Sequence, residues 1–222
     1  MYIPWFALIL SLKVAVFSLI VNLVLGLPLG FLLARKQFWG KEFLDTILTL
    51  PMVMPPTVLG YYLLVLLGRN GFIGYGLEHY FGINLIFTWQ GAVIAASIVT
   101  FPLIFKQVRT AFEGINQQYE QTAQMLGISN FAIFFRILLP LAWPNILVGL
   151  LLAFARSLGE FGATLMVAGS IPGKTQTMSI AIYEAVQSGQ DTIANSLVII
   201  LSVVCVFILL SAKYLSSHKI HT

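Results

Sequence analysis

Residues 121–140 read QTAQMLGISNFAIFFRILLP and form the longest polar interruption between the hydrophobic segments in the middle of the chain. The pattern predicts two short helices, with a turn at residues 127–130 that begins at Gly127, and an end at Pro140. Gln117, Gln118 and Glu120 lead into this stretch. Such a segment is too polar to cross a bilayer and too apolar on one side for a free loop. We therefore expect an amphipathic element at the membrane surface that faces a soluble partner.

The composition is that of an integral membrane protein. Of the 222 residues, 59% are hydrophobic and only 9% are charged, whereas a soluble domain carries about a quarter charged residues. The apolar runs continue for about 20 residues or more, which favours helices over the alternating strands of a barrel. A single cysteine, Cys205, excludes an internal disulfide and a cysteine-based metal cluster. No basic residue precedes the first apolar run, so no cleaved signal peptide is expected.

We predict an all-α integral membrane protein with a single transmembrane domain over residues 1–222 and a loop at about 117–140 within it. The five predicted spans cover about residues 5–34, 44–67, 89–112, 141–167 and 193–214. A sixth span is the alternative and would need residues 164–190 to cross. Pro172, Lys174 and Glu184 in that stretch favour an external loop with a short helix.

The basic residues predict the orientation. With five spans, one side of the membrane receives Arg35, Lys36, Lys41, Lys106, Arg109, Arg136, Lys213 and Lys219. The opposite side receives only Arg69 and Lys174. Because Lys and Arg concentrate in cytoplasmic loops, we expect the N-terminus outside, and the C-terminus and residues 117–140 in the cytoplasm. The net charge of +4 follows this topology and does not indicate nucleic-acid binding.

Three prolines mark the second predicted span. Pro51, Pro55 and Pro56 cannot donate backbone hydrogen bonds, so the helix is kinked or broken there. One interpretation is a tolerated packing kink. The other is a helix that lines a pathway that opens and closes.

The spacing within residues 121–140 resembles a pattern in the membrane subunits of binding-protein-dependent ABC importers. In that family a cytoplasmic loop carries Glu-Ala-Ala, three residues, Gly, nine residues, Ile, one residue and Leu-Pro. The corresponding residues here are Gln121, Thr122, Ala123, Gly127, Ile137, Leu139 and Pro140. The first two identities differ, and Glu120 is the candidate for the missing carboxylate. The resemblance implies a type I importer permease fold in which this loop forms coupling helices that dock on a partner ATPase.

Four further blocks are similar to the molybdate permeases of that family, at residues 50–61, 68–74, 155–164 and 171–177. They occur in the expected order, and the resemblance covers nearly the whole chain. It implies import of an oxyanion, with molybdate as cargo and sulfate, thiosulfate or tungstate as alternatives. It also implies a second copy of the chain, cytoplasmic ATPase subunits that hold ATP and Mg²⁺, an external binding protein and a bacterial inner membrane. No cofactor or metal is expected on this chain.

Arg156 and Glu160 are four residues apart in an apolar helix, so they are predicted to share one face. Ionisable groups in a span usually face the bundle interior or a cavity. Three interpretations stay open. The residues form a mutually neutralising structural pair, they hold an outer gate or docking surface in one state, or Arg156 contacts the oxyanion directly. Glu160 argues against the third interpretation because it would repel an anion.

Residues 168–175 fit a relaxed phosphate-loop pattern, but they follow a span, contain Pro172 and face outward. We therefore expect no nucleotide site there. Lys174, Gln176 and Thr177 are instead candidate contacts for the binding protein, and Arg69 lies on the same predicted side.

The sequence thus predicts a non-catalytic permease subunit in which ATPase closure pushes residues 121–140 and rocks the helices between inward-open and outward-open states. A secondary transporter is the alternative from a different class. It would carry buried ionisable groups in several spans and usually internal repeats. The chain has one Arg–Glu pair of this kind and no evident repeat.

Overall fold

The computed structural model describes residues 5–217, with side chains up to residue 211, and all its regular elements in that range are helices. They are α1 (Trp5–Arg35), α2 (Lys41–Thr49), η1 (Leu50–Met52), α3 (Pro56–Leu67), α4 (Phe72–Phe81), α5 (Trp89–Glu113), α6 (Gln117–Met125), α7 (Asn130–Ile133), the π-helical η2 (Phe134–Leu138), α8 (Leu139–Leu158), α9 (Gly162–Ala168), α10 (Met178–Gln187) and α11 (Asp191–Ser217).

Four helical segments in the described range are long and apolar enough to cross a membrane: α1, α5, the unit Asn130–Leu158 and α11. The pair α2–η1 and α3 makes a fifth if it counts as one span. The first, third and fifth predicted spans are therefore confirmed. Helices α9 and α10 have only 7 and 10 residues, so residues 164–190 contain no sixth span.

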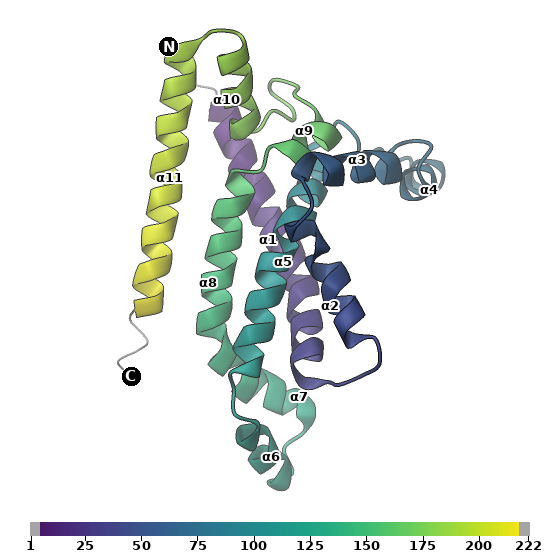
Figure 1. Ribbon diagram of the computed structural model, residues 1–222, viewed down its shortest axis with the longest axis vertical. Helices are drawn as coiled ribbons and strands as arrows, with labels where there is room; N and C mark the ends of the chain where they lie inside the picture. Colours follow the sequence, from purple (N-terminus) through teal and green to yellow (C-terminus); the bar gives the residue numbers. More distant parts are fainter. Residues whose placement is uncertain (1–4, 218–222) are drawn as a thin grey trace.

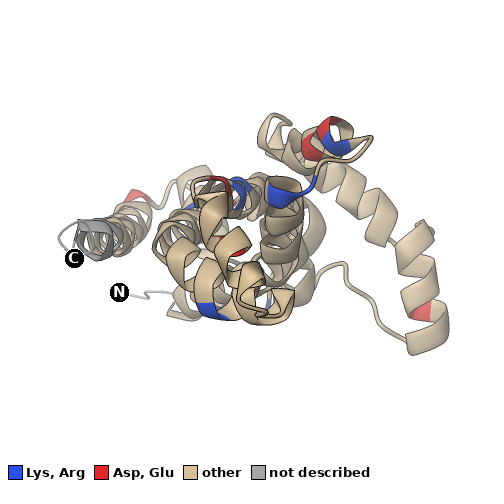
Figure 2. Ribbon diagram, turned by 90° about the horizontal axis from the view of Figure 1, so that it is seen from below, with Lys and Arg blue, Asp and Glu red and all other residues tan. Residues whose placement is uncertain are grey.

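The chain runs up and down the long axis of the molecule (Figure 1). Helices α1, α5 and α11 run toward the lower end and α2 and α8 run away from it, while α6 and α7 lie at that end. Arg35, Lys41, Arg109 and Arg136 fall in segments near this end, and Arg69 follows α3 far from it. These five basic residues therefore lie as the five-span prediction expects. Viewed from the α6 end, most of the ribbon carries no charged residue (Figure 2). Lys219 lies outside the described residues.

Helix α3 leaves the bundle sideways (Figure 1). The pair α2–η1 and α3 is bent by 107°. Pro55 has φ −56° and ψ 133°, and Pro56 is the first residue of α3, where the missing N–H costs no hydrogen bond. The prolines therefore break the span. The sequence predicts a kinked or a broken helix here, and the structure has the broken form.

The fourth predicted span, residues 141–167, is wrong at its C-terminal end. Helix α8 ends at Leu158, and α9 begins only at Gly162. The intervening chain leaves helical geometry, with Gly159 at ψ 6° and Phe161 at φ −129°. The apolar composition continues through this break, so hydropathy alone does not reveal it.

Small residues let α1 and α5 pack closely. A Cβ atom at Gly30 would lie 2.6 Å from Cγ1 of Val108 and 3.1 Å from the backbone N of Arg109. Polar contacts also join the helices inside the bundle: Asn22 Nδ2 donates to Thr100 Oγ1 at 2.9 Å, and the hydroxyls of Ser18 and Ser157 are 3.0 Å apart. Such interhelical hydrogen bonds stabilise helix association within a bilayer.

Candidate functional site

Local hydrogen bonds define the start of α6 and the turn between α6 and α7. Asn116 caps α6, because its side chain accepts a hydrogen bond from the Gln118 N–H at 2.9 Å. After α6, Gly127 has φ +76°. Its N–H donates to Gln124 O at 2.9 Å, and the Ile128 N–H donates to Ala123 O at 3.1 Å. These two bonds are a Schellman motif, which requires a residue in the left-handed region. The turn predicted at residues 127–130 is present.

The expected end of the loop at Pro140 is wrong. Helix α7 continues through the π-helical segment η2 directly into α8, and Pro140 lies in the first turn of α8. Pro140 cannot donate to the carbonyl four residues earlier. Just before it the helix widens, and the Leu139 N–H bonds to the carbonyl of Phe134, five residues back. The helix therefore accommodates the proline and does not stop.

The predicted loop residues divide into buried and exposed groups. Ala123 is 4% exposed and packs in a cluster with Phe112, Ile133 and Leu138. Thr122, Ala123 and Ile137 line a groove of about 560 Å³ beside α6. Gln121, Thr122 and Gly127 are exposed, whereas Leu139 is half-buried in the start of α8. The structure thus brings Thr122, Ala123 and Ile137 together and leaves Leu139 and Pro140 in α8.

The end of this segment carries exposed apolar side chains. Met125, Leu126 and Phe131 have exposed fractions of 87%, 75% and 75%. They lie around the α6–α7 turn, at the end of the molecule beyond the long helices (Figure 1). Exposed apolar clusters at such a position favour contact with another protein.

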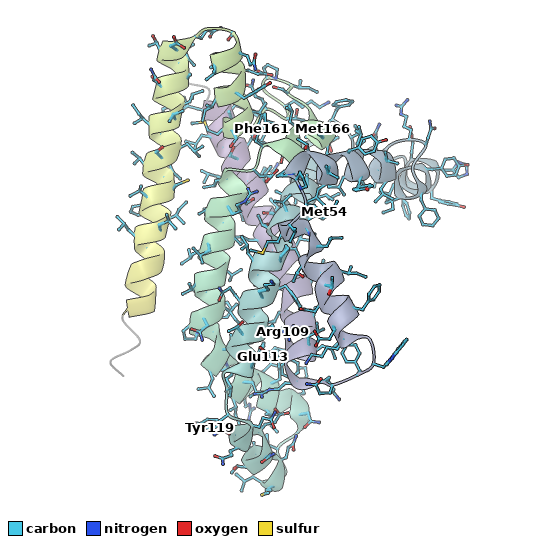
Figure 3. All side chains as sticks on the ribbon, viewed as in Figure 1. Met54, Arg109, Glu113, Tyr119, Phe161 and Met166 are labelled. Carbon is cyan, nitrogen blue, oxygen red and sulfur yellow. The ribbon has the colours of Figure 1, made fainter. Side chains whose placement is uncertain are left out.

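The break before α3 lies against the break between α8 and α9. A Cβ atom at Gly60 of α3 would lie 2.8 Å from Met166 Cβ and 2.9 Å from Ala163 Cα, and one at Gly162 would lie 3.1 Å from Pro56 Cβ. Helices α3 and α9 are therefore in backbone contact, which only glycine at position 60 permits. In Figure 3 this region can be found by the labels of Met54, Phe161 and Met166. Of the candidate pathway prolines, Pro55 and Pro56 lie at this junction and Pro51 lies in η1.

Arg156 and Glu160 stabilise the second break. Arg156 Nη1 lies 2.9 Å from Glu160 Oε2. Glu160 Oε1 also accepts a hydrogen bond from the Ala163 N–H at 3.1 Å, in the first turn of α9. The positive charge is at the C-terminal end of α8 and the negative charge at the N-terminal end of α9, where each complements the helix dipole. The expectation that both residues lie in one helix is wrong, because Glu160 follows the end of α8.

The sequence model of the family described as "Binding-protein-dependent transport system inner membrane component" matches residues 26–221 of this chain. The chain belongs to this family. It is 45% identical over 209 residues to the molybdenum transport system permease protein ModB of Escherichia coli K12, covering 93% of this chain and 91% of the relative. It is 38% identical over 195 residues to the sulfate transport system permease protein CysW of Synechococcus elongatus, covering 88% and 68%.

The fold is that of the permeases of type I ABC importers. A chain of the MetNI methionine ABC transporter in an inward-facing conformation matches 97% of this chain and 95% of its own length, with a TM-score of 0.75 at 17% identity. This inner-membrane component is accordingly a multi-pass membrane protein.

The candidate binding-protein contacts of this family member are spread over separate segments. Arg69 follows α3, is 73% exposed at its side chain and lies 3.3 Å from Glu78 through its Nε. Lys174 is exposed in the segment before α10. Gln176 is half-buried and donates to Glu184 and to Ser170. The structure does not join these residues in one cluster.

Residues 168–175 do not form a phosphate loop. Ala168 ends the seven-residue helix α9, residues 169–175 follow it, and no strand precedes them in the described chain. The Thr175 hydroxyl accepts from the Ile171 N–H at 3.1 Å and is thus used within the turn. Among the side chains that the structure describes, residues 5–211, there is no group of three or more His, Cys, Asp or Glu that could hold a metal ion.

Sequence reasoning missed two interhelical arginines near the α6 end. Arg109 on α5 bonds Asp45 of α2 at 2.6 Å and Glu113 at 2.8 Å (Figure 3). Arg35, the last residue of α1, lies 3.6 Å from Glu120 of α6. The sequence pattern identifies both arginines only as basic markers of membrane topology. The i,i+4 spacing of Arg109 and Glu113 was a usable signal, whereas the partners in α2 and α6 are distant in sequence.

Proposed function

We propose that this chain is the membrane-spanning permease subunit of an ATP-driven importer that moves molybdate from an external binding protein into the cytoplasm. The observation that carries the proposal is the α6–α7 segment. It lies beyond the spans, ends in exposed Met125, Leu126 and Phe131, and has the spacing of the family's coupling loop. The similarity to ModB over nearly the whole chain supports molybdate as cargo.

The chain itself is non-catalytic in this proposal. ATP and Mg²⁺ are held by two partner ATPase subunits in the cytoplasm. Their closure displaces α6 and α7, and the displacement passes into α8, because α7, η2 and α8 are one continuous helix. The helices then rock between inward-open and outward-open states.

The remaining parts of the importer follow from the same proposal. Two copies of the chain form the pathway in the lipid bilayer of a bacterial inner membrane, with the N-terminus outside and the C-terminus in the cytoplasm. The distribution of basic residues toward the α6 end supports this orientation. The external binding protein contacts the opposite end, for which Arg69, Lys174 and Gln176 remain candidates.

Tungstate, sulfate and thiosulfate are the alternative cargoes. Sulfate is less favoured because the sulfate permease relative is less similar than the molybdenum permease relative. A secondary transporter, the alternative from another class, would not need the exposed apolar segment at the α6–α7 turn.

Reconstitution tests the proposal. The tagged chain is co-expressed with the ATPase encoded beside it, purified in detergent and placed in liposomes with ATP inside and the binding protein outside. We expect the ATPase to co-purify and labelled molybdate to enter only with ATP. Unlabelled tungstate should compete, and excess sulfate should not. Molybdate uptake without an ATPase, or ATP-driven uptake of sulfate alone, would contradict the proposal.

A further inference from the structure

Arg35 connects the end of α1 to the start of α6. It is the last residue of α1, and only 8% of its side chain is exposed. Its Nη2 donates to the carbonyl of Ile115 at 3.2 Å, in the short connection between α5 and α6. Its Nε lies 3.6 Å from Oε2 of Glu120, in the first turn of α6. One buried guanidinium therefore contacts both the connection that leads to α6 and α6 itself.

Glu120 faces the bundle together with Ala123. The two residues are three positions apart on α6, so they share one helix face. Ala123 is buried in the apolar cluster of α5, α7 and η2, and the Glu120 side chain is 28% exposed. Helix α6 is thus held by an apolar contact at Ala123 and by an ionic contact at Glu120. Glu120, the candidate for the missing carboxylate of the coupling loop, thus contacts Arg35 within the chain.

The ionic contact is incomplete in this conformation. Arg35 Nε is fully buried and has no hydrogen-bond partner among the described residues. At 3.6 Å its carboxylate neighbour is beyond the distance of a charge-assisted hydrogen bond, which is about 2.7–2.9 Å. Gln117, Gln121 and Gln124 line the same polar pocket of about 220 Å³. A shift of α6 by less than 1 Å toward Arg35 would complete the bond.

We propose that Arg35 is a positioning residue for energy coupling, because its contact with Glu120 sets the orientation of α6 and transmits the displacement of α6 to α1. The pair closes to a hydrogen bond in one transport state and opens to the observed distance in the other. Helix α1 packs along α5 through Gly26 and Gly30, so a displacement delivered to α1 reaches the centre of the bundle. This inference rests on the proposed function as an ATP-driven permease.

The test uses the complete reconstituted importer with Arg35→Glu, Glu120→Arg and the double variant that exchanges the two charges, together with the isosteric Glu120→Gln. Three quantities are measured: the ATPase that co-purifies, the ATP hydrolysed, and the molybdate taken up per ATP. We expect the single variants to keep the ATPase bound and to lower uptake per ATP by at least about five-fold, the lower end of coupling between two sites. The charge exchange should recover at least half of the loss.

Glu113→Gln is the matched control, because it removes a carboxylate at the same end of the bundle that pairs with Arg109. It should leave uptake per ATP unchanged. Unaltered coupling in Glu120→Gln, or a charge exchange no better than the single variants while the ATPase still co-purifies, would overturn the inference. If the single charge reversals fail to assemble, Glu120→Gln alone decides. Failure of the unmodified complex to take up any oxyanion with ATP would refute the proposed function, and with it the coupling role that rests on that function. Normal ATP-driven uptake by the unmodified complex, with unaltered coupling in Glu120→Gln, would refute this inference alone.

Discussion

Arg156 Nη1 and Glu160 Oε2 are 2.9 Å apart across the break between α8 and α9. The Glu160 side chain is only 1% exposed, whereas that of Arg156 is 40% exposed. The pair therefore joins two helix ends with a buried acid and a partly exposed base. Glu160 Oε1 also accepts a hydrogen bond from the Ala163 N–H, which fixes the first turn of α9.

Replacing Arg156 with Ala should leave a buried carboxylate without its counter-charge. Breaking a fully buried pair in this way costs about 3–5 kcal/mol, and the 40% exposure of Arg156 lowers the cost here because water screens its charge. We expect a lower thermal unfolding midpoint in detergent and ATP hydrolysis that is uncoupled from uptake. The double variant Arg156→Met with Glu160→Gln should be milder in the unfolding assay, because no charge is stranded. Unchanged, coupled transport by Arg156→Ala would refute a role for the pair in the transport cycle.

Gly127→Pro should weaken coupling to the ATPase more than Glu120→Ala does, because it disrupts the α6–α7 turn. Gly127 has φ +76° and donates its N–H to Gln124, whereas proline fixes φ near about −65° and has no N–H. We expect Gly127→Pro to lose the co-purified ATPase, and Glu120→Ala to retain it with weaker coupling. Gly114→Ala is the control, because Gly114 has φ −71° and its nearest obstacle is 3.5 Å away. Equal or reversed severity of the first two variants would count against this assignment.

Gly60→Ala should force α3 and α9 apart. The new Cβ would lie 2.8 Å from Met166 Cβ and 2.9 Å from Ala163 Cα. Such overpacking costs about 1–3 kcal/mol, measurable as a lower unfolding midpoint. Gly76→Ala on α4 is a matched control because nothing lies within 4 Å of its added Cβ. It should be neutral or stabilising by about 0.5–1 kcal/mol. Equal midpoints for the two variants would show that the helices separate easily.

Asn22 and Thr100 should be energetically coupled. Asn22 Nδ2 donates to Thr100 Oγ1 at 2.9 Å, and their side chains are 1% and 0% exposed. A double-mutant cycle with Asn22→Leu and Thr100→Val, read out by denaturation in detergent, should give a coupling of about 0.6 kcal/mol and no more than about 1.7 kcal/mol. Strict additivity would mean that the hydrogen bond contributes nothing to the packing of α1 on α5.

Particular residues explain how much of the fold was predictable. Gly127 and Ser129 specify their turn and cap through local backbone chemistry, so the two short helices were predictable. Pro55 and Pro56 break α3 from α2 for an equally local reason. The break at residues 159–161 was missed because the residues on both sides are apolar and the decisive contact, Glu160 with the start of α9, forms only in three dimensions.

The candidate site was predictable in its spacing but not in its contacts. The positions of Thr122, Ala123, Gly127 and Ile137 followed from a local pattern, and the structure places them around one turn or groove. The pairing of Glu120 with Arg35 could not be predicted from the local pattern, because Arg35 is on a different helix far away in sequence. The continuity of the helix through Pro140 also escaped prediction, since a π-helical turn has no simple sequence signature.

The helix from Asn130 to Leu158 is continuous, so a tilt at one of its ends would move the other end. Its 29 residues extend for about 43 Å, so a tilt of only about 5° at the α7 end displaces the α8 end by about 4 Å. Without the widened π-helical turn, Pro140 would have kinked the helix, and the kink would have absorbed that tilt locally. Because the widened turn keeps the helix continuous, a small displacement of Phe131 would produce a larger lateral movement beside Arg156, at the far end of the bundle.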